Sequence, residues 1–107
     1  MATKKRKWVL IGSGSWGLFY GQIDDDKATR DDIVASKAAY VYNCRNVRYW
    51  YGPTGGITSL AACGPNPADT RNRIGAPCGA LITQIVNVYD VPPEAQKRFD
   101  GVKWIVT

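Results

Sequence analysis

The chain has 107 residues, 45% of them hydrophobic and 21% charged, which is a normal composition for one soluble globular domain. It contains no histidine, which removes the commonest general base and the commonest metal ligand, and its three cysteines lack the spacing of a zinc site. No apolar run reaches the ~18 residues of a membrane-spanning helix, and the one after the basic start is too short for a secretory signal, so we expect a cytoplasmic protein without metal or membrane partner.

The first residues of the chain are strongly basic. The net charge of +5 depends mainly on four cations near the start: Lys4, Lys5, Arg6 and Lys7. Without them the chain is nearly neutral. This pattern predicts a solvated basic arm over residues 1–6, followed by a single globular domain over residues 7–107. Such an arm contacts nucleic acid weakly through phosphates, in a salt-dependent way.

A glycine-rich hairpin is predicted next, with strands at Lys7–Gly12 and Trp16–Ile23. Gly12, Gly14 and Gly17 satisfy the G-x-G-x-x-G pattern, and the local string resembles the first turn of NAD-dependent glycerol-phosphate dehydrogenases. Dinucleotide binding, however, requires a helix that begins inside this loop, and the aromatic and glycine residues that follow are poor helix formers. We therefore expect a hairpin turn and no cofactor.

The following segment, Asp24–Asp32, is highly charged and predicts a solvated connection. The stretches Lys37–Asn43 and Asn46–Tyr51 are rich in tyrosine and valine, which favours β-strands. Between them, Asn43–Asn46 predicts a bulge or a tight turn.

The second half of the chain predicts two helices and further strands. Ile57–Cys63 forms about two helical turns, and Asn66–Pro77 is a polar loop. Leu81–Val91 is the clearest strand, Pro92–Phe99 is a short helix entered through proline, and Val102–Val106 is extended. The whole pattern predicts an α+β fold: a small antiparallel β-sheet or a partly closed barrel of about six short strands, with two short helices.

This order of features resembles a family of small, uncharacterised phage and prophage proteins. The shared features are a glycine-containing hairpin, an aromatic strand with an arginine, a Leu-Ala helix that ends in glycine, a loop with Ile and then Pro, an apolar strand and a terminal helix. The matching residues are Gly17, Gly21, Arg45, Tyr49, Trp50, Tyr51, Leu60, Ala61, Ala62, Gly64, Ile74, Pro77, Val86, Val88, Glu94 and Ala95. The resemblance implies a phage origin and a location in the host cytoplasm, and it supplies no activity.

The residue types favour a binding protein over an enzyme. The chain has one glutamate, and no nucleophile lies beside a recognisable base, so we predict no catalytic residue. Aromatic rings offer stacking faces and guanidinium groups bind phosphate, which favours a pocket for an anionic, nucleotide-like ligand. The predicted ligand-binding residues are Trp16, Tyr20, Arg45, Arg48, Trp50, Tyr51, Arg71, Asn72 and Arg73.

A phage protein with such a pocket is expected to sequester a host immune signalling nucleotide, as anti-defence sponges do. A domain of this size has little room for a deep pocket, so we expect a homo-oligomer with sites between protomers. Two alternatives stay open. One is a nucleic-acid-binding accessory protein, which the basic arm and the aromatic strand favour. The other is a virion or assembly component, which needs only a sheet edge or an apolar patch.

Overall fold

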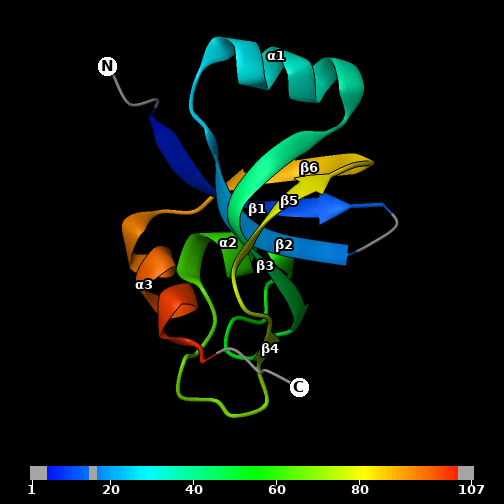
Figure 1. Cartoon of the computed structure of the whole chain (residues 1–107). Coiled ribbons are helices and arrows are strands. Elements are labelled where there is room, and N and C mark those ends of the chain that lie inside the picture. Colours follow the sequence, from blue (N-terminus) through cyan, green and yellow to red (C-terminus); the bar gives the residue numbers. More distant parts are fainter. Residues whose placement is uncertain (1–4, 15–16, 104–107) are drawn as a thin grey trace.

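The computed structural model describes residues 5–14 and 17–103 and shows an antiparallel sheet flanked by three helices (Figure 1). In chain order the elements are β1 (Arg6–Ser13), β2 (Gly17–Asp24), α1 (Lys27–Ser36), β3 (Ala39–Tyr49), α2 (Ile57–Cys63), β4 (Arg73–Ile74), β5 (Cys78–Ile82), β6 (Ile85–Asp90) and α3 (Pro93–Gly101). The strand order is β4-β3-β2-β1-β6, and β5 pairs with β3 off this path. The predicted α+β class with a small antiparallel sheet is confirmed. No helix of the described ranges is long and apolar enough to cross a membrane.

β1 and β2 form the predicted hairpin, whose register begins with Arg6 opposite Asp24. Side chains alternate between the two faces of a strand. In β1 this alternation places Val9 and Ile11 in one buried cluster and Leu10 in the other. The hairpin is therefore covered on both faces.

β3 is one continuous strand where two were predicted, and the predicted bulge lies inside it. Asn43 has a φ of 52°, and the pairing of β3 with β2 shifts by one residue nearby. One edge of β3 pairs with β2, while the other edge pairs with β5 in its first half and β4 in its second half. β3 is thus the strand that joins the two parts of the sheet.

The segment Leu81–Val91, predicted as one strand, is divided at Gln84, which has a φ of 55°. β5 before this residue pairs with β3, and β6 after it pairs with β1. The chain therefore crosses from the β3 side of the sheet to the β1 side within the short link between β5 and β6. The buried cluster on this side contains Val9, Ile11, Ile23, Ala39, Val41, Cys44, Ile82 and Ile85.

α2 and α3 cover the opposite face of the sheet (Figure 1). α2 has the predicted bounds, and α3 continues to Gly101 where the prediction ended at Phe99. Tyr20 of β2 lies between the rings of Trp8 and Phe99, with centroid separations of 4.8 and 4.1 Å. This stack joins the sheet to α3, and stacked aromatic rings contribute ~0.5–1.5 kcal/mol beyond the area that they bury.

The prediction of a solvated connection over Asp24–Asp32 is wrong, because most of this segment belongs to a third helix, α1. Asp26 caps the first turn by accepting a hydrogen bond from the Thr29 backbone N–H at 2.7 Å, and Lys37 ends the helix in the left-handed conformation. α1 has no buried residue. It lies above the sheet, on the side away from α2 and α3 (Figure 1).

Candidate functional site

Arg45 was predicted to bind a ligand, but it is a structural residue. Its side chain is buried, and the guanidinium donates hydrogen bonds to the backbone carbonyls of Gly75 at 2.7 Å, Phe99 at 2.8 Å and Val102 at 2.9 Å. A further bond to the Ile74 carbonyl is longer, at 3.4 Å. These carbonyls belong to β4 and the loop after it, and to the end of α3 and its C-cap residue. Arg45 therefore connects β3 to both segments and presents no guanidinium face to a ligand.

Tyr20 and Asn72 are also buried, so two more of the predicted ligand-binding residues are structural. Tyr20 donates its hydroxyl to Asp100 at 3.2 Å, and burial raises the pKa of the phenol well above its ordinary value. Asn72 donates to the carbonyls of Asn66 and Asp69 and accepts from the backbone N–H of Tyr51. Both polar groups form hydrogen bonds within the fold, because buried polar atoms require partners.

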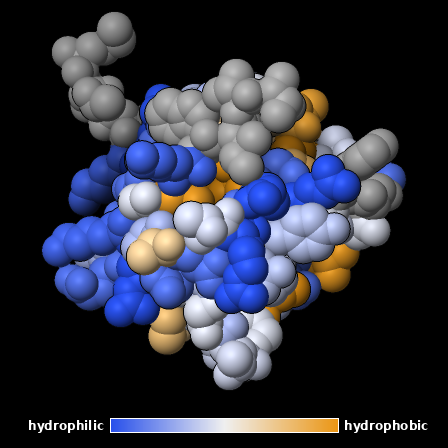
Figure 2. Space-filling model, turned by 90° about the horizontal axis from the view of Figure 1, so that it is seen from below, coloured by the Kyte–Doolittle hydropathy of each residue, from blue (hydrophilic) through white to orange (hydrophobic). Residues whose placement is uncertain are grey.

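Arg71 lies near Tyr51, and both Arg71 and Arg73 bind neighbouring groups of their own loop. The Arg71 guanidinium lies 4.0 Å from the Tyr51 ring centroid and forms two hydrogen bonds with Asp69, at 2.7 and 3.0 Å. These hydrogen bonds lower the pKa of Asp69 to about 2. Arg73 donates to the carbonyls of Thr70 and Asn72. The end of the molecule that carries this loop is mainly hydrophilic (Figure 2).

The remaining predicted residues do not complete a pocket with this pair. Arg48 is exposed and lies 5.7 Å from the ring centroid of Tyr49. Trp50 is half-buried and packs against the core. Trp16 lies outside the described residues. The arginine and aromatic side chains that the structure describes are therefore divided between the core, the loop before β4 and the outer surface.

The basic arm is shorter than predicted, because β1 begins at Arg6. The Arg6 guanidinium lies 3.6 Å from the ring centroid of Tyr42, and Lys7 forms an ion pair with Asp90 at 3.1 Å. The Lys5 carbonyl accepts a hydrogen bond from the Asp25 backbone N–H. Lys4 lies outside the described residues. Two of the four predicted contact cations are thus part of the folded sheet.

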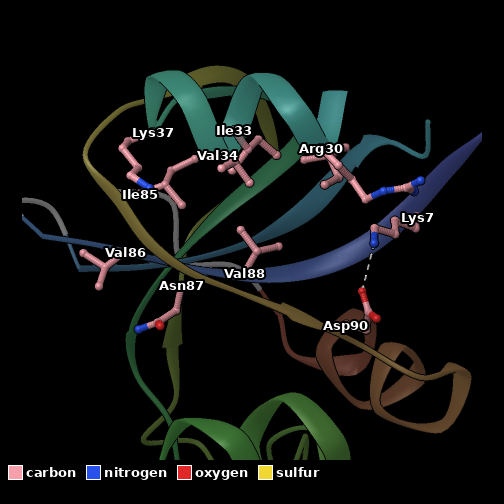
Figure 3. A pocket seen from close by; sticks show the side chains of 11 residues that line it. Lys7, Arg30, Ile33, Val34, Lys37, Ile85, Val86, Asn87, Val88 and Asp90 are labelled. Atoms are coloured by element: carbon pink, nitrogen blue, oxygen red, sulfur yellow. Dashed lines mark ion pairs between the residues drawn. The ribbon is translucent and has the colours of Figure 1, made fainter. Parts of the chain in front are cut away.

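A groove lies between α1 and the edge of β6, and it contains none of the predicted ligand residues. Its volume is about 400 Å³, which lies within the ~300–1,000 Å³ range of ligand sites in proteins. Figure 3 shows side chains from α1 and β6 facing each other across it. The residues that line the groove are Lys7, Ile23, Arg30, Ile33, Val34, Lys37, Ile85, Val86, Asn87, Val88 and Asp90.

The helical repeat explains the upper wall of this groove. Arg30, Ile33, Val34 and Lys37 are spaced as i, i+3, i+4 and i+7, which places them on one side of a helix. That spacing was present in the sequence, together with an aspartate in the N-cap position. Sequence reasoning missed it because the acidic residues of the segment were interpreted as a solvated loop.

The lower wall belongs to β6, which is the last strand of the sheet path. β6 pairs with β1 and has no second neighbour in the strand order of the described residues. Ile85 and Val88 contact the core cluster under β5, while Val86 is 66% exposed. On α1, Val34 is 71% exposed. Apolar side chains on both walls are thus open to solvent.

The charges around the groove are mostly positive. Three cations and one carboxylate line it, and Lys7 and the Asp90 carboxylate form the ion pair at one end. Arg30 lies at the same end, and its guanidinium forms a long ion pair of 3.5 Å with the Asp25 carboxylate. Lys37 lies at the other end (Figure 3). Exposed ion pairs of this kind contribute little to stability. An anionic ligand can therefore replace them at low cost.

The groove combines apolar side chains with cations, which suits the binding of an anion. The groove contains no histidine, thiol or paired carboxylates. The described residues contain no group of three metal-ligating side chains. Comparisons with protein-family models, with curated proteins and with solved structures find no match to this chain.

Proposed function

We propose that this chain is a non-enzymatic binding protein whose ligand is a small organic anion with an apolar body, held between α1 and β6. The observation that carries the proposal is the packing of α1. The helix has no fully buried residue: Ile33 is only half-buried against the core, and Val34 is 71% exposed where it lines the open groove. A ligand in this groove supplies the packing that the helix lacks.

The apolar part of the ligand is expected to contact Val34 on one wall and Val86 and Val88 on the other. The first two side chains are largely exposed in the free protein. Each Å² of apolar surface removed from water contributes ~25 cal/mol, so covering these side chains favours binding. Isolated helices shorter than ~12–15 residues are marginal in water, and α1 has 10 residues. Binding should therefore also stabilise the helix.

The anionic group of the ligand is expected to lie near Arg30 or Lys37. Arg30 offers a planar fork that matches carboxylate or phosphate, and Lys37 offers a mobile ammonium. A nucleotide belongs to this ligand class, with its phosphate at one end of the groove and its base on the aliphatic side chains. A host immune signalling nucleotide, and a phage origin for the protein, stay predictions that rest on the resemblance.

The test measures binding of two probes, anilinonaphthalene sulfonate and a cyclic dinucleotide, by fluorescence and by calorimetry. We expect either Arg30→Gln or Lys37→Gln, whichever removes the cation beside the anionic group, to weaken binding of the probe by about tenfold, because it removes a charge-assisted contact of ~1.5–3 kcal/mol. Lys27→Gln is the matched control. It changes the same charge on the same helix, but Lys27 faces Asp31 and does not line the groove.

Hydrogen exchange gives the second readout. A bound probe should slow exchange in α1 more than in α3, because only α1 forms a wall of the groove. Equal affinity in the Arg30, Lys37 and Lys27 variants, or protection confined to the loop around Arg71, would refute the site. Steep salt dependence with nucleic acid, and no binding of either probe, would favour the nucleic-acid alternative instead.

A further inference from the structure

Cys44 and Cys78 lie opposite each other on neighbouring antiparallel strands. Cys44 of β3 and Cys78 of β5 are Cα partners in the register. Residues directly opposed in an antiparallel pair have Cα atoms ~4.5–5.5 Å apart, and disulfides span Cα distances of ~4.4–6.8 Å. The backbone thus holds the two cysteines within disulfide range, although both thiols are free.

The bulge in β3 creates this opposition. Val41 pairs with Ala80, and the next pair is Cys44 with Cys78, so β3 advances one residue more than β5. Without that extra residue, Cys44 would face Pro77. The irregularity therefore aligns the two thiols, which belong to the same face of the sheet because directly opposed side chains point the same way.

The two thiols differ in exposure, which sets the order in which they react. Cys78 is exposed at the start of β5, while Cys44 is buried in the core cluster. Burial raises the pKa of Cys44 to about 11, and the neighbouring Cys78 contributes to the increase. A reagent in solution therefore meets Cys78 first. Cys63, also exposed, ends α2 and lies in neither of the two paired strands.

We propose that Cys44 and Cys78 form a reversible oxidation site, which closes to an intramolecular disulfide by exchange with a small disulfide such as oxidised glutathione. The Cys78 thiolate attacks one glutathione sulfur, forms a mixed disulfide and releases one glutathione thiolate. The Cys44 sulfur, after losing its proton, attacks Cys78 Sγ and displaces the second glutathione thiolate. The two protein thiols are oxidised, one glutathione disulfide is reduced, and the two protein protons end on the two glutathione thiols.

The bond links strands that are far apart in sequence and joins β5 to β3 covalently. Such a link restricts the unfolded chain more strongly than the folded one, so the oxidised protein should melt at a higher temperature. The site is independent of the groove between α1 and β6, because neither cysteine lines that groove. Failure of one proposal leaves the other unchanged.

The experiment treats the folded Cys63→Ser variant, which retains only the opposed pair, with oxidised glutathione at mildly alkaline pH. We expect both remaining thiols to be lost, a mass lower by two hydrogens, no retained glutathione, and a cross-linked peptide that contains Cys44 and Cys78. Dithiothreitol should restore the two thiols and the original mass and remove the cross-link. The melting temperature should rise on oxidation and return on reduction.

Two further variants in the same background separate the steps. With Cys44→Ser, Cys78 should keep one glutathione, because no second thiol resolves the mixed disulfide. With Cys78→Ser, Cys44 should stay reduced while the protein is folded. The proposal fails if the Cys63→Ser protein stops at a glutathione adduct on Cys78 with Cys44 free, or if the cross-link forms only in urea. The Cys78→Ser arm keeps the test informative if the substitution at the buried Cys44 prevents folding.

Discussion

Arg45→Met should destabilise the protein strongly, although the sequence pattern marked Arg45 as a ligand residue. The side chain is 4% exposed, and its guanidinium donates to the carbonyls of Gly75 at 2.7 Å and Val102 at 2.9 Å. It also donates to the Phe99 carbonyl, but that oxygen keeps a second donor, the Val102 backbone N–H. A buried acceptor left without a donor costs ~1–3 kcal/mol, so two of them cost ~2–6 kcal/mol. Removing the cost of burying the guanidinium offsets part of this loss. We expect the free energy of unfolding to fall by about 3 kcal/mol.

The assay is urea unfolding followed by tryptophan fluorescence, with Arg48→Met as the matched control. Arg48 lies three residues along the same strand and is exposed, so its replacement should change the free energy of unfolding by less than ~0.5 kcal/mol. Arg45→Lys should recover little, because one ammonium cannot reach the loop before β5 and the end of α3 together. A loss below ~1 kcal/mol in Arg45→Met, or equal losses in both methionine variants, would show that Arg45 does not hold these segments together.

Two further predictions concern the core around β3. Gly21→Ala should lower the free energy of unfolding in urea by ~1–3 kcal/mol, because the added Cβ would lie 2.6 Å from Val41 Cγ1 and 2.9 Å from the Tyr42 carbonyl oxygen. Gly12→Ala is the control, because its added Cβ would lie 3.8 Å from its nearest neighbours. Equal losses in the two variants would contradict the steric reasoning. For Cys44, the folded state raises the thiol pKa from 9.0 to about 11, so the unfolded state binds fewer protons in between and stability should fall as pH rises through this window. Under reducing conditions, the free energy of unfolding of the Cys44→Ala variant should fall less steeply between pH 9 and 11 than that of the unchanged protein. The same pH profile of unfolding in both proteins would refute this prediction.

Much of the sheet could be predicted from residue patterns alone. The β1–β2 hairpin, the bulge near Asn43, and the short helices after residues 56 and 92 follow from alternation, glycine and proline chemistry, and capping. Helix α1 was missed although Asp26 and the spacing of Arg30, Ile33 and Val34 indicated it. The acidic composition of that segment outweighed a periodicity that spans only three turns.

The candidate site was predicted less well, because residue type does not reveal burial. Arg45 and Tyr20 have the chemistry of ligand-binding residues, but a guanidinium or a phenol can equally satisfy buried backbone and carboxylate groups. Arg71 lies beside Tyr51, but the carboxylate of Asp69, two residues away, already binds its guanidinium.

Local patterns in the chain were sufficient to determine the fold class and the positions of most strands, because periodicity and turn chemistry act over a few neighbouring residues. The tertiary structure decided which side chains are available for function. It turned the chain at Gln84 so that β6 became a sheet edge under α1, and it shifted β3 so that Cys44 faces Cys78. Both features depend on pairing between segments distant in sequence, and no short window of residues encodes which distant strand a segment will meet.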